Sequence, residues 1–184
     1  IYGSIAELGR ICGAQKKASE LTAKMKTEIE AIVSRVKGLP APSVLLCVSR
    51  ELSEKRISVF YAAGTKTFYN ELITLAGGKN VLSGEKGGYP YPKISQEGLA
   101  SLDPDAIIDL VGERTFYHSM EHIDLDKVFD EKNLRGQWLA GAKVKAVRGG
   151  RVTVLDGTVF LRPGPRLPVI LKAFAKAVHP EVKW

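Results

Sequence analysis

The sequence predicts an α/β fold: a three-layer αβα arrangement with a mostly parallel sheet, preceded by a long N-terminal helix. Apolar residues recur with a helical period between residues 14 and 37. Val44–Val48 is a continuous apolar run and Ala106–Val111 is apolar apart from one residue, and both are typical of strands buried on both faces. Helical segments alternate with the strand signals, which favours a sheet of about four or five strands joined by crossover helices.

The N-terminal part of the chain is expected to be helical. Ser4 can cap a first helix over Ile5–Ile11, which Gly13 interrupts. A second helix from Ala14 to about Lys37 has Lys and Glu on one face and apolar residues on the other. It would contain about 24 residues and be roughly 36 Å long, and a glycine and two prolines end it. Its apolar positions are Leu21, Met25, Ile29, Ile32, Val33 and Val36.

The middle of the chain alternates between strand and helix signals. After Val44–Val48, the segment Ile57–Ala62 is rich in β-branched and aromatic residues and predicts a second strand. A glycine–threonine turn then leads into a helix over Lys66–Ala76, which Gly77 ends. Gly84–Lys93 holds several glycines and prolines, so we expect a loop there.

The second half continues the alternation. Ser95 can cap a short helix that ends at Leu102, and Ala106–Val111 follows as a third strand. Glu113–Arg135 is ambiguous and is interpreted as two short helices around Asp124. The later elements are a weak helix over Trp138–Val144, a strand over Val152–Leu155 and a helix over Leu167–Val178.

Composition limits the possible functions. A chain of 184 residues can bury one sizeable core, and no apolar run approaches the roughly 20 residues of a membrane-spanning helix. The net charge of +7 favours an anionic partner, but the basic residues are scattered, so we expect no nucleic-acid binding. Cys12 and Cys47 are too few for a disulfide framework. Because the chain begins at Ile1, we expect it to be processed or cut from a longer protein.

A binding site is expected at one edge of the sheet. In α/β sheets, ligands lie beyond the carboxyl ends of the strands. The loops expected there carry tyrosines and arginines, which suit a large anionic chelate because a Tyr ring offers apolar area and an Arg offers a planar fork. The alternative for Tyr61 and Phe160 is that they are core residues at strand ends. The aromatic and arginine residues of these loops are Tyr61, Tyr89, Tyr91, Tyr117, Phe160, Arg162 and Arg166.

One short motif points to a different chemistry. His118, Glu121 and His122 match His-x-x-Glu-His, in which two histidines bind zinc and the glutamate activates water. The segment has only moderate helical patterning and the sequence offers no convincing third ligand, so a solvated surface is the simpler interpretation. A glycine-rich segment at 84–88 lacks the Gly-Lys-Ser/Thr of a phosphate-binding loop. We therefore expect no enzyme, no cofactor and no metal site, with a zinc hydrolase kept as an alternative.

Residues 64–181 resemble the C-terminal lobe of the periplasmic binding proteins that serve ABC importers of iron-siderophores, cobalamin and haem. The resemblance depends on the order and spacing of short motifs. It implies that residues 1–40 form the helix that connects two lobes and that 41–184 form the C-terminal lobe, with the N-terminal lobe absent from this chain. The motifs are Ala-Gly-Gly-Lys-Asn-Val at 76–81, Ile-Ser-Gln-Glu at 94–97, Asp-Pro-Asp-Ala-Ile-Ile at 103–108, Trp138, Gly-Arg-Val at 150–152, Arg-Pro-Gly-Pro-Arg at 162–166 and His-Pro-Glu at 179–181.

The resemblance also implies roles for individual residues. Glu97 matches the glutamate that docks on arginines of the permease. Tyr91 and Tyr61 match aromatic positions that line the ligand cleft, and Arg166 matches a Pro-Arg position near the ligand. A tyrosine stands at 91 where the family has a tryptophan, and residues 113–135 have little similarity to the family. The resemblance therefore leaves the identity of the ligand open. The candidate ligand-binding residues are Tyr61, Tyr91, Phe160, Arg162 and Arg166.

The expected function is that of the substrate-binding component of an ABC importer, which captures a metal chelate and delivers it to the permease. A ferric siderophore is preferred because the basic charge favours an anionic chelate. Cobalamin or haem is the alternative within the class, and a stand-alone interaction domain is a further one. The expected partners are the ABC permease and the chelate, and the membrane surface is reached only through the transporter or a lipid anchor. The expected location is the periplasm, or the cell exterior as a membrane-anchored lipoprotein.

Overall fold

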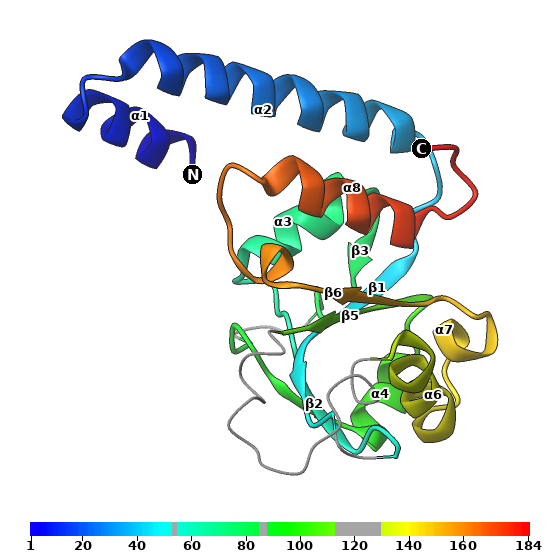
Figure 1. The fold of residues 1–184 in the computed structure, drawn as a ribbon. Coiled ribbons are helices and arrows are strands. Elements are labelled where there is room, and N and C mark those ends of the chain that lie inside the picture. The colour runs from blue at the N-terminus through cyan, green and yellow to red at the C-terminus, as the bar shows by residue number, and fades with distance from the viewer. Residues whose placement is uncertain (53–54, 85–87, 113–129) are drawn as a thin grey trace.

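The computed structural model describes residues 1–52, 55–84, 88–112 and 130–184. Its central sheet has helices on both faces (Figure 1). Helices α3 (Phe68–Leu75) and α8 (Leu167–Val178) cover one face, and the N-terminal helices stack over α8. The other face is covered by α4 (Gln96–Leu102), α6 (Glu131–Gly141) and α7 (Lys145–Arg148). The predicted three-layer α/β fold is confirmed.

The N-terminal helices form an antiparallel hairpin, in which α1 (Tyr2–Ile11) packs on α2 (Gln15–Val36). The prediction that Ser4 caps a helix over 5–11 is wrong, because the Ile5 N–H already donates to the Ile1 carbonyl at 3.0 Å. Gly13 turns the chain with a φ of 64°. The two helices are close at Gly9, where a Cβ would lie 2.5 Å from the Cβ of Ala18.

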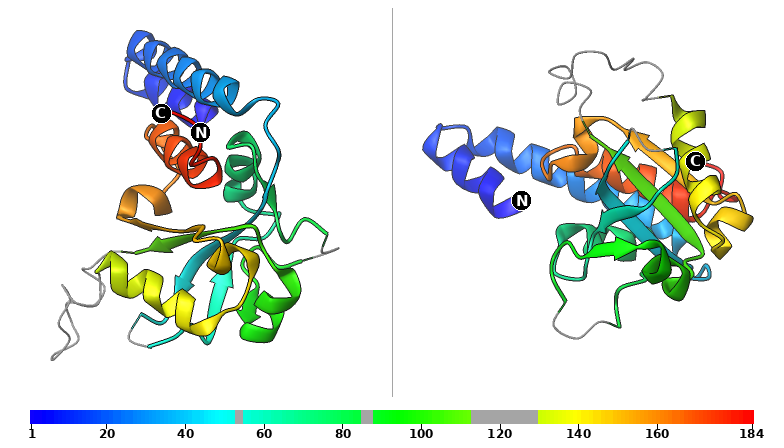
Figure 2. Two further views of the ribbon diagram at one scale, coloured as in Figure 1. Left: turned by 90° about the vertical axis from the view of Figure 1, so that its right-hand side faces the viewer. Right: turned by 90° about the horizontal axis from the view of Figure 1, so that it is seen from below.

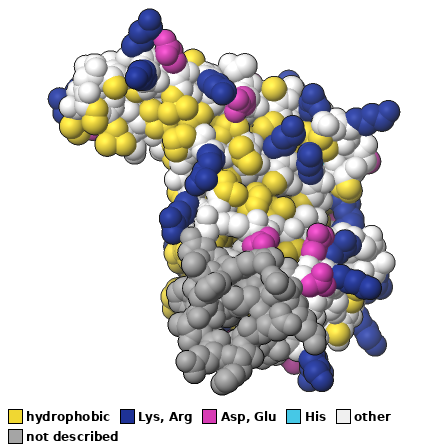
Figure 3. Space-filling model, viewed as in Figure 1, with side chains coloured by type: hydrophobic (Ala, Val, Ile, Leu, Met, Phe, Trp, Pro, Cys, Tyr) yellow, Lys and Arg dark blue, Asp and Glu magenta, His cyan; other side chains and the backbone are white. Residues whose placement is uncertain are grey.

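Helix α2 confirms the predicted long helix, with 22 residues. Its buried side chains include Met25, Ile32 and Val36, and it packs along α8. The hairpin projects beyond the sheet in the right-hand view of Figure 2, and in the left-hand view it lies over α8. Apolar side chains remain exposed on it, among them Leu8 and Ile11, and Figure 3 shows apolar atoms gathered on this arm.

Among the described residues the sheet has six strands, in the order β4-β2-β1-β5-β6 with β3 also paired to β1. The pairs β1–β3, β1–β5 and β5–β6 are parallel, whereas β1–β2 and β2–β4 are antiparallel. The antiparallel edge follows from chain length, since the segment between β1 and β2 is too short for a crossover helix. The strands are β1 (Ser43–Arg50), β2 (Val59–Ala62), β3 (Lys79–Asn80), β4 (Lys93–Ser95), β5 (Ala106–Val111) and β6 (Val152–Asp156).

The predicted and observed helix bounds agree for the last helix of the chain and differ for the helix that starts at Glu131. Helix α8 spans the predicted Leu167–Val178. The predicted helix over 138–144 is wrong in its bounds, because the Asp130 carboxylate accepts the N–H of Asn133 at 2.8 Å and starts α6 at Glu131. Most of the two short helices expected over 113–135 lies at 113–129, outside the described residues.

The two larger apolar clusters of the described residues hold the layers together. One lies between the sheet and α2, α3 and α8, and includes Ile108 and Phe174. The other lies on the opposite face, where the Trp138 ring meets the Phe60 ring edge-on at 5.2 Å. Strand β5 contributes to both cores, which is why its residues form a continuous apolar run apart from Asp109.

Candidate ligand-binding site at the carboxyl edge of the sheet

A cleft of about 330 Å³ opens at the carboxyl ends of β1 and β5. Because parallel strands end at the same edge of a sheet, residues far apart in sequence meet there. Its lining combines apolar walls with a few polar groups. The lining residues are Val48, Ser49, Arg50, Leu52, Leu110, Val111, Gly112, Thr158, Leu161 and Arg162.

The short 3-10 helix η2 (Thr158–Leu161) forms one wall of the cleft. Strand β6 leads into it through Gly157, whose φ of 122° is disfavoured for residues with a Cβ. The N–H of Gly157 donates to the carbonyl of Val111 at 3.3 Å, which joins the end of β6 to the end of β5. This turn brings Arg162, the residue after η2, to the cleft.

The two arginines of the lining have different surroundings. The Arg50 side chain is 1% exposed, and its guanidinium contacts the buried carboxylate of Asp109 at 2.8 Å. Arg162 is exposed and also lines the cleft. Arg162 is therefore the lining arginine better placed to meet an anionic ligand.

Tyr61 and Tyr91 lie on one open face of the β2–β4 ribbon. Tyr61 is opposite Ser49 of the cleft lining in the β1–β2 ladder, and directly opposed residues share a face. The ladder continues past β4, since Gly64 N–H donates to the Pro90 carbonyl at 2.8 Å, which places Tyr91 diagonally next to Tyr61. The two side chains are 44% and 45% exposed, so the interpretation of Tyr61 as a core residue is wrong.

Phe160 lies behind the cleft, partly buried against the core beneath α8. Its carbonyl accepts a hydrogen bond from the Tyr69 hydroxyl at 3.0 Å. Tyr69 is 3% exposed, and burial, with a smaller contribution from Tyr91, raises the pKa of its hydroxyl. The hydroxyl therefore stays protonated and holds η2 in place. Nothing in the sequence marked Tyr69 as part of the site.

Arg166 is not among the residues that line the cleft. It lies at the N-cap of α8 and is exposed. The structure thus places Arg162 in the cleft lining and Tyr61, with Tyr91 next to it, opposite the lining residue Ser49. It places Phe160 behind the cleft and leaves Arg166 on the helix that follows.

The sequence did not mark several of the residues that line the cleft. The strand was predicted to end at Val48, whereas β1 continues to Arg50 and carries Ser49 into the lining. Thr158 and Leu161 belong to a predicted loop, but nothing in their residue types marks a site. The available signal was position, because both follow a strand at the expected edge.

Glu97 occupies the first turn of α4 and is exposed. The Ser95 hydroxyl caps this helix by accepting the N–H of Gly98 at 3.3 Å. Hydrogen bonds from the Ser95 side chain and from its own backbone N–H lower the pKa of Glu97. The carboxylate is therefore ionised and presented to solvent at neutral pH.

The hydrolase alternative depends on His118, Glu121 and His122, which lie outside the described residues. Among residues 1–52, 55–84, 88–112 and 130–184, no group of three or more His, Cys, Asp or Glu side chains could hold a metal ion. Nor is any helix in these ranges long and apolar enough to cross a membrane.

Two sequence relatives match nearly the whole of this chain. The chain is 27% identical over 184 residues to the uncharacterized ABC transporter substrate-binding lipoprotein YvrC of Bacillus subtilis, covering 98% of this chain and 50% of YvrC. It is 29% identical over 174 residues to a cobalamin-binding protein of Halobacterium salinarum, covering 95% and 42%. The chain thus spans about half the length of these relatives.

A solved structure has the same fold. The periplasmic heme-binding protein of Pseudomonas aeruginosa superposes with a TM-score of 0.72 and 28% sequence identity. The superposition covers 99% of this chain and 60% of that protein. Residues 1–158 also match the family described as periplasmic binding protein. The chain therefore belongs to the periplasmic binding protein family.

Proposed function

We propose that the protein to which this chain belongs is the substrate-binding component of an ABC importer and captures a metal chelate. The main support is the cleft at the carboxyl edge, which has Arg162 in its lining and two exposed tyrosines beside it. A binding protein needs such a concave site and needs no reacting group. It is thus not an enzyme in this proposal.

A ferric siderophore is the preferred ligand. An arginine at the cleft can pair with the oxygens of an anionic chelate, and Tyr61 and Tyr91 can cover its apolar surface. The net charge of +7 also favours an anionic ligand. Cobalamin and haem are the alternatives, and the named relatives from Halobacterium and Pseudomonas support keeping both.

The proposal also assigns each part of this chain to a region of a two-lobed protein. Residues 1–40 would be the connecting segment, and 41–184 the C-terminal lobe of a two-lobed binding protein. The exposed apolar side chains of Leu8 and Ile11 on α1 support contact with another part of the protein. A cleft formed by one lobe would then supply only part of the ligand contacts.

Delivery requires a permease, and Glu97 is the proposed docking residue. Its ionised carboxylate stands exposed at the start of α4, where an arginine of a partner can approach it. The protein would work outside the cytoplasmic membrane, in the periplasm or anchored to the cell surface as a lipoprotein. The likeness to the lipoprotein YvrC supports the second arrangement. Scattered basic residues, seen on one face in Figure 3, do not suggest nucleic acid as a partner.

Titration of the complete two-lobed protein with four ligands tests the proposal. The ligands are a ferric hydroxamate, a ferric catecholate, cobalamin and haem, and intrinsic fluorescence reports binding. One of the two ferric siderophores should bind at stoichiometric ratio. Binding of cobalamin or haem alone would replace the preferred ligand, and failure of all four would contradict a chelate-binding function.

A further inference from the structure

A buried ion pair lies directly behind the cleft. Arg50 is the last residue of β1 and Asp109 lies within β5, and their side chains are 1% and 0% exposed. Taking both charges out of water is costly, and the cost is offset only if the pair has further hydrogen bonds. The partners of this pair therefore indicate what it holds in place.

One carboxylate oxygen of Asp109 collects three donors. Its Oδ2 accepts from Arg50 Nε at 2.9 Å and from Trp138 Nε1 at 2.8 Å, and Arg50 Nη2 lies 2.8 Å away. Trp138 belongs to α6, and the Arg50 guanidinium lies 5.9 Å from the centre of its ring. The ion pair thus joins two strands of the sheet to one helix.

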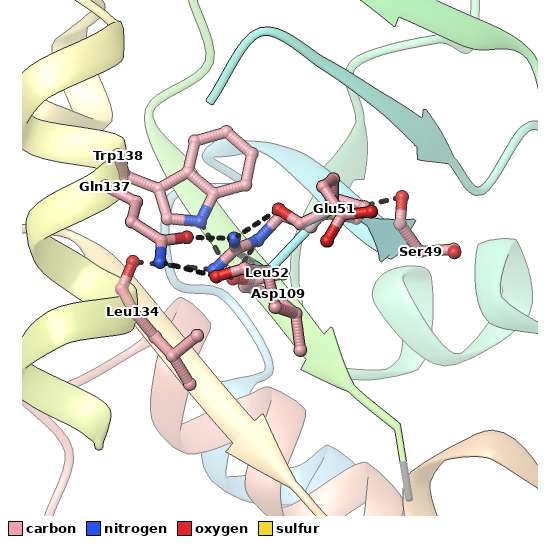
Figure 4. A network of polar contacts seen from close by, with 9 residues as sticks. Ser49, Glu51, Leu52, Asp109, Leu134, Gln137 and Trp138 are labelled. Atoms are coloured by element: carbon pink, nitrogen blue, oxygen red, sulfur yellow. Dashed lines mark hydrogen bonds and ion pairs between the residues drawn. The ribbon is translucent and has the colours of Figure 1, made fainter. Parts of the chain in front are cut away.

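Gln137 extends the connection from α6 to the cleft. Its Oε1 accepts from Arg50 Nη1, and its Nε2 donates to the Leu52 carbonyl at 3.0 Å. Arg50 Nη1 also donates to the Glu51 carbonyl at 3.4 Å. Figure 4 shows Gln137 and Trp138 directed from α6 towards Asp109 and the chain at Glu51 and Leu52. Residues 50–52, here named the corner, are therefore held against α6.

The corner forms part of the cleft wall. Leu52 and Val111 line the cleft, and both pack against Leu134 of α6 in a small apolar cluster. A shift of α6 would carry Leu134 away from this wall and would pull the Leu52 carbonyl with Gln137. The position of α6 and the shape of the cleft are thus linked by packing and by hydrogen bonds.

We propose that Arg50, Asp109 and Gln137 are positioning residues, which fix the corner against α6 and thereby set the shape of the ligand cleft. The inference rests on the proposed function for its ligand, but the mechanical link between α6 and the corner does not. None of the three needs to contact the ligand. Ligand bound in the cleft should in turn hold α6 more firmly, because coupling between two sites is reciprocal.

Gln137→Met tests the link without leaving a buried charge unpaired. It keeps the length of the side chain and removes only the hydrogen bonds to Arg50 and Leu52. Hydrogen exchange of the complete two-lobed protein should become faster in peptides covering residues 50–52 and 131–141, and stay unchanged in α3 and α8. The matched control is Arg135→Gln, which breaks the exposed pair with Glu131 on the same helix and should change neither region.

Ligand binding supplies the second readout. The ferric siderophore that the unmodified protein binds should slow exchange over 131–141, and Gln137→Met should abolish this protection and weaken the affinity about tenfold. The double variant Arg50→Met with Asp109→Leu replaces the pair by apolar side chains, and should fold while showing the same local changes.

Each possible result decides the proposal. Unchanged exchange at 50–52, or an equal rise in α3 and α8, would overturn the mechanical link. Faster local exchange with unchanged affinity would overturn the positioning role. If no chelate binds the unmodified protein, the proposed function fails, and the exchange comparison between Gln137→Met and Arg135→Gln still tests the link on its own.

Discussion

Tyr69→Phe removes one partly buried hydrogen bond from behind the cleft and leaves the aromatic ring in place. The ring packs against Phe174, with centroids 6.3 Å apart, so the core keeps its shape. The lost interaction is the bond from the hydroxyl to the Phe160 carbonyl, at 3.0 Å. An unsatisfied carbonyl costs about 1–3 kcal/mol when fully buried. Because Phe160 is only partly buried, water can reach its carbonyl, and we expect the interaction free energy to fall by about 1 kcal/mol.

The assay separates global from local effects of this change. Urea unfolding measures the free energy of unfolding, and ligand titration of the two-lobed protein measures the affinity. If η2 loosens without unfolding of the protein, the lost free energy appears as weaker ligand binding. A loss of about 1 kcal/mol corresponds to a roughly fivefold higher Kd. Tyr2→Phe on α1 is the control and should change neither quantity. Unchanged stability together with unchanged affinity for Tyr69→Phe would refute the role of this hydroxyl.

Three other predictions concern a turn, a carboxylate and the docking surface. Gly64→Ala would place a Cβ 2.6 Å from the Tyr89 carbonyl oxygen, so it should lower the free energy of unfolding by about 1–3 kcal/mol, measured in urea. The Ser43 N–H and hydroxyl lower the pKa of Asp105, so this carboxylate stabilises the fold above its unfolded pKa of about 3.9. That contribution disappears as the pH falls through the lower pKa of the folded state. The difference in unfolding free energy between the unmodified protein and Asp105→Asn should shrink over the same pH range. Glu97→Arg should leave ligand affinity unchanged and reduce uptake in cells, because it replaces attraction to permease arginines by repulsion.

Each of these predictions can fail clearly. An unfolding free energy of Gly64→Ala equal to that of the unmodified protein would mean that the turn adjusts freely. A stability difference for Asp105→Asn that is constant from about pH 6 to about pH 3 would remove the carboxylate from the acid response. Normal uptake by the Glu97→Arg protein would exclude this residue from permease docking.

Local patterns predicted the regular elements well. Helix α2 follows directly from a helical period and strand β5 from a mostly apolar run, and α8 has the predicted bounds. Strand direction was harder, because the residues of β2 carry no sign of which way the strand runs. The short segment between Val48 and Ile57 was the available clue to the antiparallel edge.

The site was only partly predictable for a related reason. Tyr61 and Tyr91 stand beside a glycine turn and a proline-rich loop, so residue type and position marked both. Arg50 follows the apolar run that ends at Val48, and Asp109 interrupts the run at 106–111. Nothing local indicates that the two residues pair with one another across two strands. Such partnerships depend on tertiary contacts, as does the support that Tyr69 gives to η2.

The central claim is that the ligand binds in the cleft at the carboxyl edge, and comparison of Arg162→Ala with Lys172→Ala tests it most directly. Both changes remove one positive charge, but Lys172 lies in a groove between α2 and α8, away from this cleft. The measurement is the Kd of the two-lobed protein for the ferric siderophore that it binds. Arg162→Ala should weaken binding by about 2 kcal/mol or more, roughly thirtyfold in Kd, and Lys172→Ala should leave it unchanged. Equal Kd values for the unmodified protein and Arg162→Ala, or a larger effect of Lys172→Ala, would contradict the claim.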